Sequence, residues 1–541
     1  MVEQDQTFRL LAVDTAGIQS YIFNSNRLRE NIGASYLIKL ATEEWVLETL
    51  NLTAKPHNWH DVNAAQPFND QQIENGALNA EVIYAGGGNV VILFKTKDYA
   101  VEFTHALSRQ ALCEAPGLQL DIYAEDFIWS THKRGLNEAI KTLLSNMKKA
   151  RGVRPTSAPL GGLGVTVMCQ STALPAVTTR HEQGKDFDIL RYVSAEVAAK
   201  WDAADETVKW LNAALLKNKS YSFPLDLDQL GRTKGEQSYI AVVHIDGNGM
   251  GELIRQIGIN NPANRDYINQ MRAFSQDVKH IATEAMRAAL DLIITKSVEN
   301  KCIPGVGNIA DLEFDWDTNA RQLILPIRPL VFGGDDTTFV CDGRIGLSLA
   351  VAYLNAFETE ARKANRKLTA CAGVAIVKSH YPFARAYDLA EELCGEAKEY
   401  RHKQAISGSA LDWYFTTGGL YDELENMRKR EYYVSEGNLS LRPISLHKHE
   451  SGGSGRNWED INSVTREFQT KWSGMRNKAK MLRDALRAGP EAVKQFRLVY
   501  EQTSDLPPLP GFNETGWHDK RCGYFDALEL ADIHIVLEQT S

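Results

Sequence analysis

The sequence predicts an α+β protein with two ferredoxin-like (βαββαβ) domains in tandem and helical regions in the middle and at the C-terminal end. Strand-like and helical patterns follow one another in the order β-α-β-β-α-β over residues 238–400. The same order occurs over residues 8–124, and in both segments a glycine-rich turn joins the second strand to the third. A whole domain therefore occurs twice in the chain, in contrast to a short-period repeat.

The length of 541 residues suggests three or four units of roughly 100–200 residues each. We place them at 1–130 (a degenerate first copy), 131–235 (mainly helical), 236–415 (the intact copy) and 416–541 (helical). The composition is that of an ordinary globular protein with enough apolar residues for several cores. The net charge of −9 argues against a broad surface that coats nucleic acid, although it leaves room for a local basic groove.

The seven cysteines are scattered along the chain without a C-x-x-C pair. This spacing indicates neither a disulfide framework nor a zinc ribbon. Residues 1–9 are polar and charged and lack the pattern of a signal peptide, and no long apolar span follows them. We therefore expect a reduced, cytoplasmic protein that contacts no membrane and binds no zinc.

The second copy begins with a strand at 238–246, because a near-continuous apolar run is typical of a strand buried on both faces. The run stops at Asp246, and a loop with three glycines follows it. A hairpin with an acidic turn is expected at 330–340. The remaining elements are helices at 268–289, 345–361 and 386–400 and a strand at 367–377.

The hairpin turn carries Gly333, Gly334, Asp335 and Asp336. The glycines permit backbone angles closed to other residues and allow a ligand to approach the main chain. In this strand order the first and third strands are antiparallel neighbours, so Asp246 should lie beside Asp335 and Asp336. Hard cations prefer oxygen ligands. We therefore expect these three acids to be catalytic and to bind two Mg²⁺ (or Mn²⁺) ions about 3.5–4 Å apart, as in phosphoryl displacement on a polymerase-like palm.

The strands of the first copy are expected at 8–14, 80–84, 90–94 and 118–124. Its turn, Gly86-Gly87-Gly88-Asn89, stands where the acidic turn stands in the second copy. Asp14 is kept at the end of the first strand, but the other acids are replaced. This copy is therefore not expected to hold two metal ions.

The glycine turn of the first copy leaves two interpretations open. Gly86, Gly87 and Gly88 could cradle a triphosphate through backbone N–H groups, with Asp14 or Ser20 nearby. Alternatively, this half is purely structural and its glycines serve only the turn.

The acidic turn and the loop Asp246–Gly251 resemble the palm of the large subunit of type III CRISPR effector complexes and, more distantly, GGDEF-type cyclic-dinucleotide synthases. Residues 17–22 and 34–37 are similar to the first palm of that large subunit, which carries two palms face to face. The resemblance implies that nucleoside triphosphates, usually ATP, are joined into cyclic oligonucleotides that signal viral infection.

The chain departs from this family in two places. The middle region, mainly helical with a loop at 154–162, contains Cys169 as its one cysteine, where the family often carries a four-cysteine zinc ribbon. His60 and Asp61 lie in a polar loop and do not supply the several ligands of the family's HD-type nuclease. These departures favour a free-standing or reduced relative that signals and does not cut.

Nucleotide contacts are expected from Gly247, Asn248, Gly333, Gly334 and Lys398. For Lys398, the phosphate-binding role is implied by the GGDEF resemblance, and a solvated lysine is the alternative. Asn248 either contacts ribose or phosphate or forms the turn. His244 shares the sheet face of Asp246. A packed or hydrogen-bonded histidine is favoured there over a metal ligand.

Three functions remain open. The first is a metal-dependent nucleotidyltransferase that makes cyclic oligonucleotides. The second is a scaffold of an RNA-guided effector complex that binds guide or target RNA and partner subunits. The third, a diguanylate-type cyclase that uses GTP, is disfavoured because those enzymes pair two identical active palms. A basic run near the C-terminal end favours a solvated helix face over RNA or partner contact; it comprises Arg476, Lys478, Lys480, Arg483 and Arg487.

Overall fold

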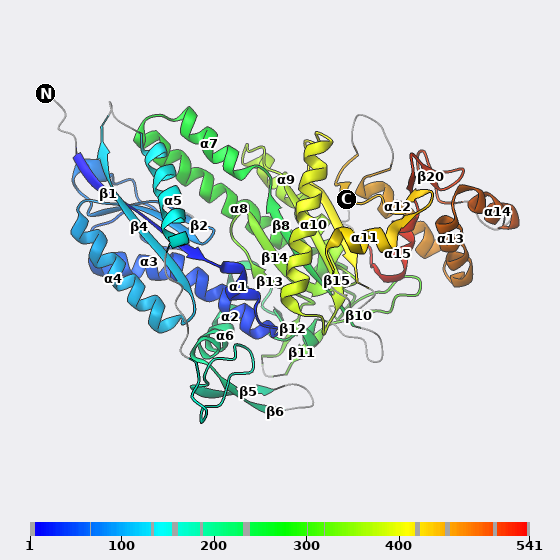
Figure 1. The fold of residues 1–541 in the computed structure, drawn as a ribbon, viewed down its shortest axis with the longest axis horizontal. Coiled ribbons are helices and arrows are strands. Elements are labelled where there is room, and N and C mark those ends of the chain that lie inside the picture. The colour runs from blue at the N-terminus through cyan, green and yellow to red at the C-terminus, as the bar shows by residue number, and fades with distance from the viewer. Residues whose placement is uncertain are drawn as a thin grey trace. The chain divides into compact units, whose positions relative to one another are not determined.

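The computed structural model describes residues 6–64, 66–130, 135–153, 161–183, 188–230, 238–299, 301–318, 320–416, 422–448, 455–500 and 506–537 (Figure 1). The chain divides into two compact units. The first comprises Met1–Leu211, Gly249–His280 and Gly333–Asp335, and the second comprises Asn212–Asn248, Ile281–Phe332 and Asp336–Ser541. The predicted α+β class with two ferredoxin-like domains is confirmed.

The first unit contains a four-stranded antiparallel sheet in the order β2-β3-β1-β4. Its strands are β1 (Gln6–Ala16), β2 (Ala80–Gly86), β3 (Asn89–Phe94) and β4 (Gln119–Trp129). The helices are α1 (Ile18–Phe23), α2 (Leu28–Lys39), a π-helical turn at Leu40–Glu44, α3 (Trp45–Thr53) and α4 (Lys97–Glu114). Strand β4 runs beyond residue 124, its predicted end, because Phe127 is only 4% exposed and still packs in the core.

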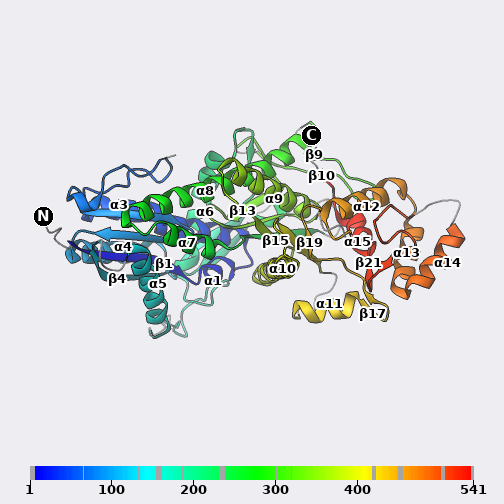
Figure 2. The same ribbon diagram turned by 90° about the horizontal axis from the view of Figure 1, so that it is seen from above.

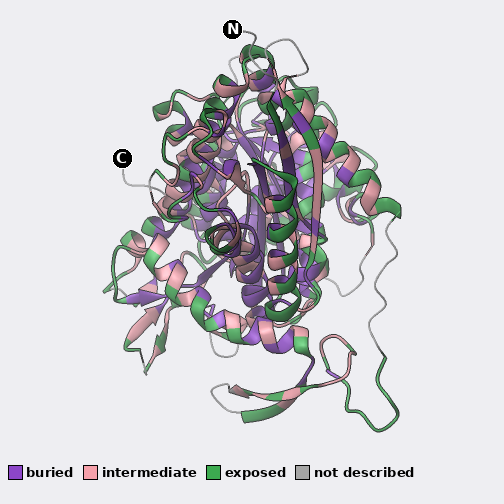
Figure 3. Ribbon diagram, turned by 90° about the vertical axis from the view of Figure 1, so that its left-hand side faces the viewer, coloured by how far each residue is buried: buried purple, intermediate pink, exposed green. Residues whose placement is uncertain are grey.

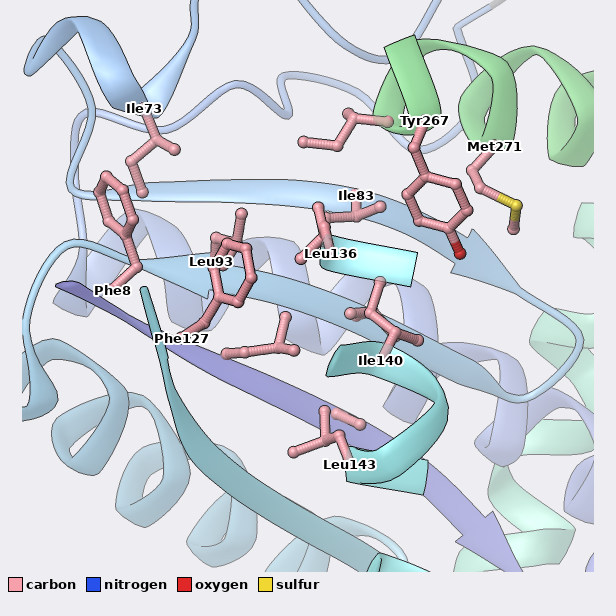
Figure 4. Close-up of a cluster of buried hydrophobic side chains, with 14 of the residues drawn as sticks. Phe8, Ile73, Ile83, Leu93, Phe127, Leu136, Ile140, Leu143, Tyr267 and Met271 are labelled. Atoms are coloured by element: carbon pink, nitrogen blue, oxygen red, sulfur yellow. The ribbon is translucent and has the colours of Figure 1, made fainter. Parts of the chain in front are cut away.

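One face of this sheet is covered by α5 (Leu136–Val153) and by the start of α8 (Asn264–Lys296). Figure 4 shows the resulting core, in which strand residues such as Leu93 and Phe127 meet Leu136, Ile140 and Leu143 of α5. These three positions recur at helical spacing, so α5 presents one apolar stripe to the sheet. The burial of this stripe attaches the start of the middle region to the first domain.

The middle region is less helical than predicted. Besides α5 and α6 (Ala195–Leu215) it contains an antiparallel hairpin, β5 (Thr178–Gln183) and β6 (Asp188–Val193). Most residues of this hairpin are exposed or half-buried (Figure 3). Its strands therefore need no alternation of apolar and polar residues, and the sequence pattern did not predict them. The ion pair between Arg191 and Glu182, 2.5 Å apart, joins its two strands. Most of the predicted loop at 154–162 lies outside the described residues.

The second unit contains a six-stranded sheet in the order β13-β14-β8-β15-β16-β19. Its strands are β8 (Tyr239–Gly247), β13 (Ile327–Val331), β14 (Asp336–Asp342), β15 (Ala370–Lys378), β16 (Ala410–Phe415) and β19 (Ile444–Ser445). The first four have the predicted βαββαβ order, and β16 extends the sheet in parallel with β15. The helices of this domain are α7 (Met250–Asn260), α8, α9 (Gly346–Lys363) and α10 (Phe383–Lys403). Short strands precede the sheet or separate α8 from β13: β7 (Tyr221–Ser222), β9 (Cys302–Ile303), β10 (Leu312–Glu313), β11 (Asp315–Asp317) and β12 (Gln322–Ile324).

The C-terminal part is helical, as predicted, with one addition. Its helices are α11 (Leu424–Tyr432), α12 (Trp458–Lys471), α13 (Arg476–Ala488), α14 (Pro490–Tyr500) and α15 (Phe525–Ile533). The same part of the chain forms a small sheet in the order β17-β18-β21-β20, and Figure 2 shows its strand β21 near α13 and α15. Its strands are β17 (Tyr433–Val434), β18 (Gly437–Asn438), β20 (Trp517–His518) and β21 (Arg521–Cys522), too short to leave a periodic signal in the sequence. Most of the predicted loop at 451–455 lies outside the described residues, and none of the described helices has the length and apolarity needed to cross a membrane.

Candidate active site

Two acids from distant parts of the sequence face each other across neighbouring strands. Asp336 opens β14, Asp246 lies next to the last residue of β8, and the two residues are directly paired in the antiparallel register. Directly opposite side chains on one sheet face are close neighbours. The predicted convergence of the first and third strands at this edge of the sheet is therefore confirmed for Asp246 and Asp336.

The turn that delivers Asp336 depends on glycine. Gly333 has φ +113°, a backbone conformation that other residues rarely adopt. Asp335 lies in the turn immediately before β14 and is half-buried. Gly333–Asp335 belongs to the first unit, where a Cβ atom built on Gly334 would stand 3.6 Å from the Cα atom of Gly87. The two glycine-rich turns are thus neighbours within that unit.

Lys398 supplies a positive charge to the edge of the sheet that carries Asp246 and Asp336, called the acidic edge below. It lies on α10, and its Nζ atom is 2.5 Å from Oδ2 of Asp246 and 3.3 Å from the carbonyl oxygen of Gly247. The Lys398 and Asp246 side chains are 32% and 38% exposed, so both remain accessible to a ligand. The alternative of a merely solvated Lys398 is wrong for this structure, in which the ammonium neutralises Asp246.

His244 is buried beneath the acidic pair. Its Nδ1 atom lies 3.1 Å from Oγ1 of Thr338 and 3.4 Å from Oδ1 of Asp336, and its ring packs edge-on against Tyr387. Burial lowers the pKa of His244 to about 4, although the charge of Asp246 acts in the opposite direction. The imidazole is therefore neutral near pH 7, in agreement with the packed, hydrogen-bonded histidine that the sequence favoured.

Asn248 performs the turn role that was one of its two predicted roles. Its backbone N–H donates to the carbonyl oxygen of Thr369 at 2.8 Å, and its side-chain amide donates to Oγ1 of Thr369 at 3.0 Å. These bonds fasten the loop after β8 to the residue that precedes β15. The next residue, Gly249, has φ +68° and is the N-cap of α7.

In the first copy the equivalent acid is paired with an arginine. Asp14 lies opposite Asn89, so the turn contributes no second carboxylate. Arg151 of α5 donates from one guanidinium nitrogen to Asp14 at 2.6 Å and from another to Asp121 on the adjacent β4. This bridge was not predicted, because Arg151 lies outside both repeated segments and no spacing rule links it to Asp14.

We expect Arg151→Met to lower the free energy of unfolding of the first unit by about 1–2 kcal/mol. This is near the low end of the roughly 1.5–3 kcal/mol for hydrogen bonds to charged groups, because the Arg151 side chain is 36% exposed. The variant is less stable because Asp14 and Asp121 would then face each other without a cation. A urea titration would measure the change. Arg255→Met is the matched control, because it removes an Arg–Glu pair whose side chains are 58% and 53% exposed and should cost less than about 1 kcal/mol. Equal stability of the two variants would show that the bridge from Arg151 to the two aspartates does not stabilise the first unit.

The glycine turn of the first copy is shaped by its neighbours. Thr15 donates from both its backbone N–H and its hydroxyl to the carbonyl oxygen of Gly88. A Cβ atom on Gly88 would lie 2.8 Å from Oγ1 of Thr15, whereas one on Gly87 would meet nothing within 4 Å. Gly86 and Gly88 also have positive φ angles, and the hydroxyl of Ser20 donates to Gly17. Gly88 is therefore required by the turn itself, and open space for a ligand lies at Gly87.

The donor set at the acidic edge suits a hard divalent cation. Asp246, Asp336 and the carbonyl of Gly247 present oxygen atoms, the ligands that Mg²⁺ and Mn²⁺ prefer. Lys398 already places a cation against two of these groups. Within the described part of the chain, however, no three His, Cys, Asp or Glu side chains converge as a preformed metal site. Substrate phosphates and water would have to complete the coordination.

Two other groups of residues singled out in the sequence have surroundings of their own. His60 and Asp61 are exposed in an irregular segment. The basic run of α13 is largely the solvated face that was expected, because Arg476, Lys480 and Arg487 are exposed. Lys478 is the exception: it is 7% exposed, with its ammonium 4.7 Å from the ring centroid of Trp472, while the exposed Arg487 also lies 4.7 Å from the ring of Phe525. These cations stabilise the C-terminal helices through cation–π contacts.

The sheet order and the paired acids give the second repeated segment the βαββαβ architecture of a palm domain. Residues 239–407 match the family model "Cas10/Cmr2, second palm domain". The chain therefore carries a Cas10-type palm, which confirms the resemblance to the large subunit of type III CRISPR complexes. Among curated proteins, none matches the sequence.

Solved structures share the architecture of the whole chain. A chain of the Csm1-Csm4 cassette in complex with pppApApA matches with a TM-score of 0.52 and 15% identity over 97% of this chain and 69% of that one. A chain of the same cassette in complex with cA4 matches with a TM-score of 0.50 and 14% identity over 98% and 70%. Csm1 in T. onnurineus matches with a TM-score of 0.50 and 15% identity over 99% and 71%. At these identities the likeness establishes the shared fold with two palms.

Proposed function

We propose that this protein is a metal-dependent nucleotidyltransferase that joins nucleoside triphosphates, first of all ATP, into cyclic oligonucleotides in antiviral defence. The observation that carries the proposal is the direct cross-strand pairing of Asp246 with Asp336 in a Cas10-type palm. The structures of the Csm1-Csm4 cassette with pppApApA and with cA4 support it, since those ligands are a linear adenylate and a cyclic one.

The residues of the acidic edge have separate tasks in this proposal. Asp246, Asp335 and Asp336 would hold Mg²⁺ or Mn²⁺. When bound, the metal lowers the pKa of the acceptor 3′-hydroxyl and offsets the charge of the departing pyrophosphate. Lys398 adds a positive charge for the triphosphate. His244 keeps its neutral ring beneath Asp336 and so does not introduce a competing cation.

The bond changes follow from in-line displacement. The 3′-oxygen of one nucleotide attacks the α-phosphorus of another, the bond from that phosphorus to pyrophosphate breaks, and the hydroxyl proton passes to solvent. Gly247, Gly333 and Gly334 have no side chain and so allow phosphates to approach the backbone closely. Asn248 orders the loop beside Gly247 through its bonds to Thr369. A last step of the same kind within one linear product closes the ring.

The first copy is proposed to bind a nucleotide without catalysing the reaction. The open backbone at Gly87, flanked by Gly86 and Gly88, is the candidate phosphate cradle. Arg151 forms an ion pair with Asp14, so the Asp14 carboxylate is not available as a metal ligand in the first copy. ATP binding measured with the double variant D335N/D336N, which lacks the acids of the catalytic turn, would test this second site separately.

The direct test is to incubate the purified chain with each nucleoside triphosphate and Mg²⁺ and to identify the products by mass spectrometry. We expect cyclic products with 3′ phosphodiester linkages from ATP, and none when Mg²⁺ is replaced by a chelator. Conversion of ATP by the chain alone would support a free-standing enzyme. Conversion that requires guide RNA, target RNA and other subunits would support the effector-complex scaffold that also carries the activity. The absence of product under both conditions would contradict the proposal.

A further inference from the structure

The ammonium of Lys398 lies against two oxygen atoms at the end of β8 that could also bind a metal ion. Its ammonium contacts one carboxylate oxygen of Asp246 at 2.5 Å and the carbonyl oxygen of Gly247 at 3.3 Å. A carboxylate together with a backbone carbonyl is a pair of donors that hard cations use. The protein thus places its own cation on donors that are suited to an external one.

The two cations exclude each other at this position. A divalent ion bound to the same oxygen of Asp246 would stand within a few ångströms of the ammonium, where like charges repel in a partly buried setting. The ammonium also uses the carbonyl of Gly247, so a metal ion would lose that donor as well. Metal binding through Oδ2 of Asp246 therefore requires Lys398 to move away.

The side chain of Lys398 is free to change position, whereas Arg151, the cation that pairs with Asp14, is fixed. A lysine ammonium is a compact charge on a flexible four-carbon stem, and this side chain is 32% exposed. Arg151 instead spans Asp14 and Asp121 with two nitrogens of one rigid guanidinium group, which holds it in place. A triphosphate beside Asp246 would offer Lys398 a more highly charged partner than a single carboxylate.

We propose that Lys398 is an exchangeable internal cation that blocks metal binding at Asp246 until a nucleoside triphosphate draws it away. The inference rests on the proposed function, because it takes Asp246 to be a metal ligand. Nucleotide binding then strengthens metal binding and, by linkage, metal binding strengthens nucleotide binding to the same degree. The free enzyme avoids holding a divalent ion at a site that lacks its substrate.

The experiment measures Mn²⁺ binding to the full chain by the loss of the free-ion EPR signal, with and without the ATP analogue AMPPNP. In the absence of nucleotide, Lys398→Gln should bind Mn²⁺ at least about tenfold more tightly than the unaltered chain, within the usual range of coupling between sites. Addition of AMPPNP should tighten Mn²⁺ binding strongly in the unaltered chain and much less in the variant. Mn²⁺ affinity that is equal or weaker in Lys398→Gln would overturn the proposal.

Two further variants make the result specific. Lys403→Gln is the matched control, because Lys403 lies on the same helix and pairs at 2.6 Å with Glu399 on an exposed surface. It should bind Mn²⁺ as the unaltered chain does. Lys398→Arg keeps the charge and should keep Mn²⁺ binding weak without nucleotide. Tight binding by Lys398→Arg would mean that shape, and not charge, controls the site, and would also overturn the proposal.

Asp246→Asn separates the failure of this inference from the failure of the proposed function. If Lys398→Gln binds Mn²⁺ more tightly and the double variant K398Q/D246N does not, the metal ion binds at Asp246 and Lys398 competes with the metal ion. If Asp246→Asn weakens Mn²⁺ binding but Lys398→Gln changes nothing, only the exchange is wrong. If neither substitution affects Mn²⁺ binding, Asp246 is not a metal ligand and the proposed function loses its basis.

Discussion

The double variant Asp335→Asn with Asp336→Asn should lose cyclic product by at least about 100-fold, because it removes the charge that would hold the catalytic metal. Asparagine keeps the size of aspartate and much of its hydrogen bonding, so the hairpin turn should survive. The Asp336 side chain is 46% exposed and lies at the edge of the core, not within it. Mass spectrometry of the products and the thermal unfolding midpoint measure the two effects separately.

A matched control for this variant is Asp388→Asn. Asp388 is an exposed residue of α10, the helix that also carries Lys398, and the substitution removes one negative charge away from the acidic edge. It should leave both product formation and the thermal midpoint unchanged. Asp246→Asn should reproduce the loss seen in the double variant. Normal synthesis by D335N/D336N would refute the assignment of these acids.

The acidic pair could be predicted from the sequence because strand order is a strong constraint. Once the β-α-β-β-α-β order is recognised, the end of the first strand must lie beside the start of the third. The exact register, in which Asp246 is opposite Asp336, is given by the structure alone. The apolar runs of β8 and β15 are buried on both faces and leave a clear signal. The convergence of these two acids, which are far apart in the sequence, could therefore be predicted from a few local patterns.

Other contacts could not be predicted, for reasons specific to each residue. Arg151 pairs with Asp14 from a helix outside the repeat, and a lysine- and arginine-rich helix end is equally typical of a solvated face. The helix α7 was missed because Gly251 and Gly258 weaken the helical pattern of a short segment. Lys398 was identified by resemblance, but nothing in the spacing shows that Asp246 holds it. Side-chain pairing of this kind depends on tertiary packing that no local pattern encodes.

A buried arginine stabilises the junction between the second palm sheet and the C-terminal helices. Arg442 is 1% exposed at its side chain, with Nε 3.0 Å from Asp526 and a second nitrogen 3.2 Å from Glu529. It also donates to the carbonyl oxygen of Trp413 at 2.9 Å, and its guanidinium stacks 4.7 Å from the ring of Tyr432. Although burial opposes the charge, these acids raise the pKa of Arg442, so it stays ionised.

We expect Arg442→Met to lower the free energy of unfolding of the second unit by about 3–5 kcal/mol, because it leaves Asp526 buried without a countercharge. Urea titration would measure this loss. Arg430→Met, which removes a 3.6 Å pair with Glu431 from a 52% exposed arginine, should cost less than about 1 kcal/mol.

The double variant R442M/D526N should be more stable than Arg442→Met alone. An amide oxygen at position 526 can still accept the backbone N–H of Leu441, which donates to Asp526 at 2.7 Å, and the charge of Asp526, whose side chain is 0% exposed, is removed. This recovery separates the penalty of a buried charge from the loss of packing around the guanidinium. If Arg442→Met and R442M/D526N unfold at the same urea concentration, the buried charge is not the origin of the effect, and the stacking against Tyr432 and Trp413 must supply it.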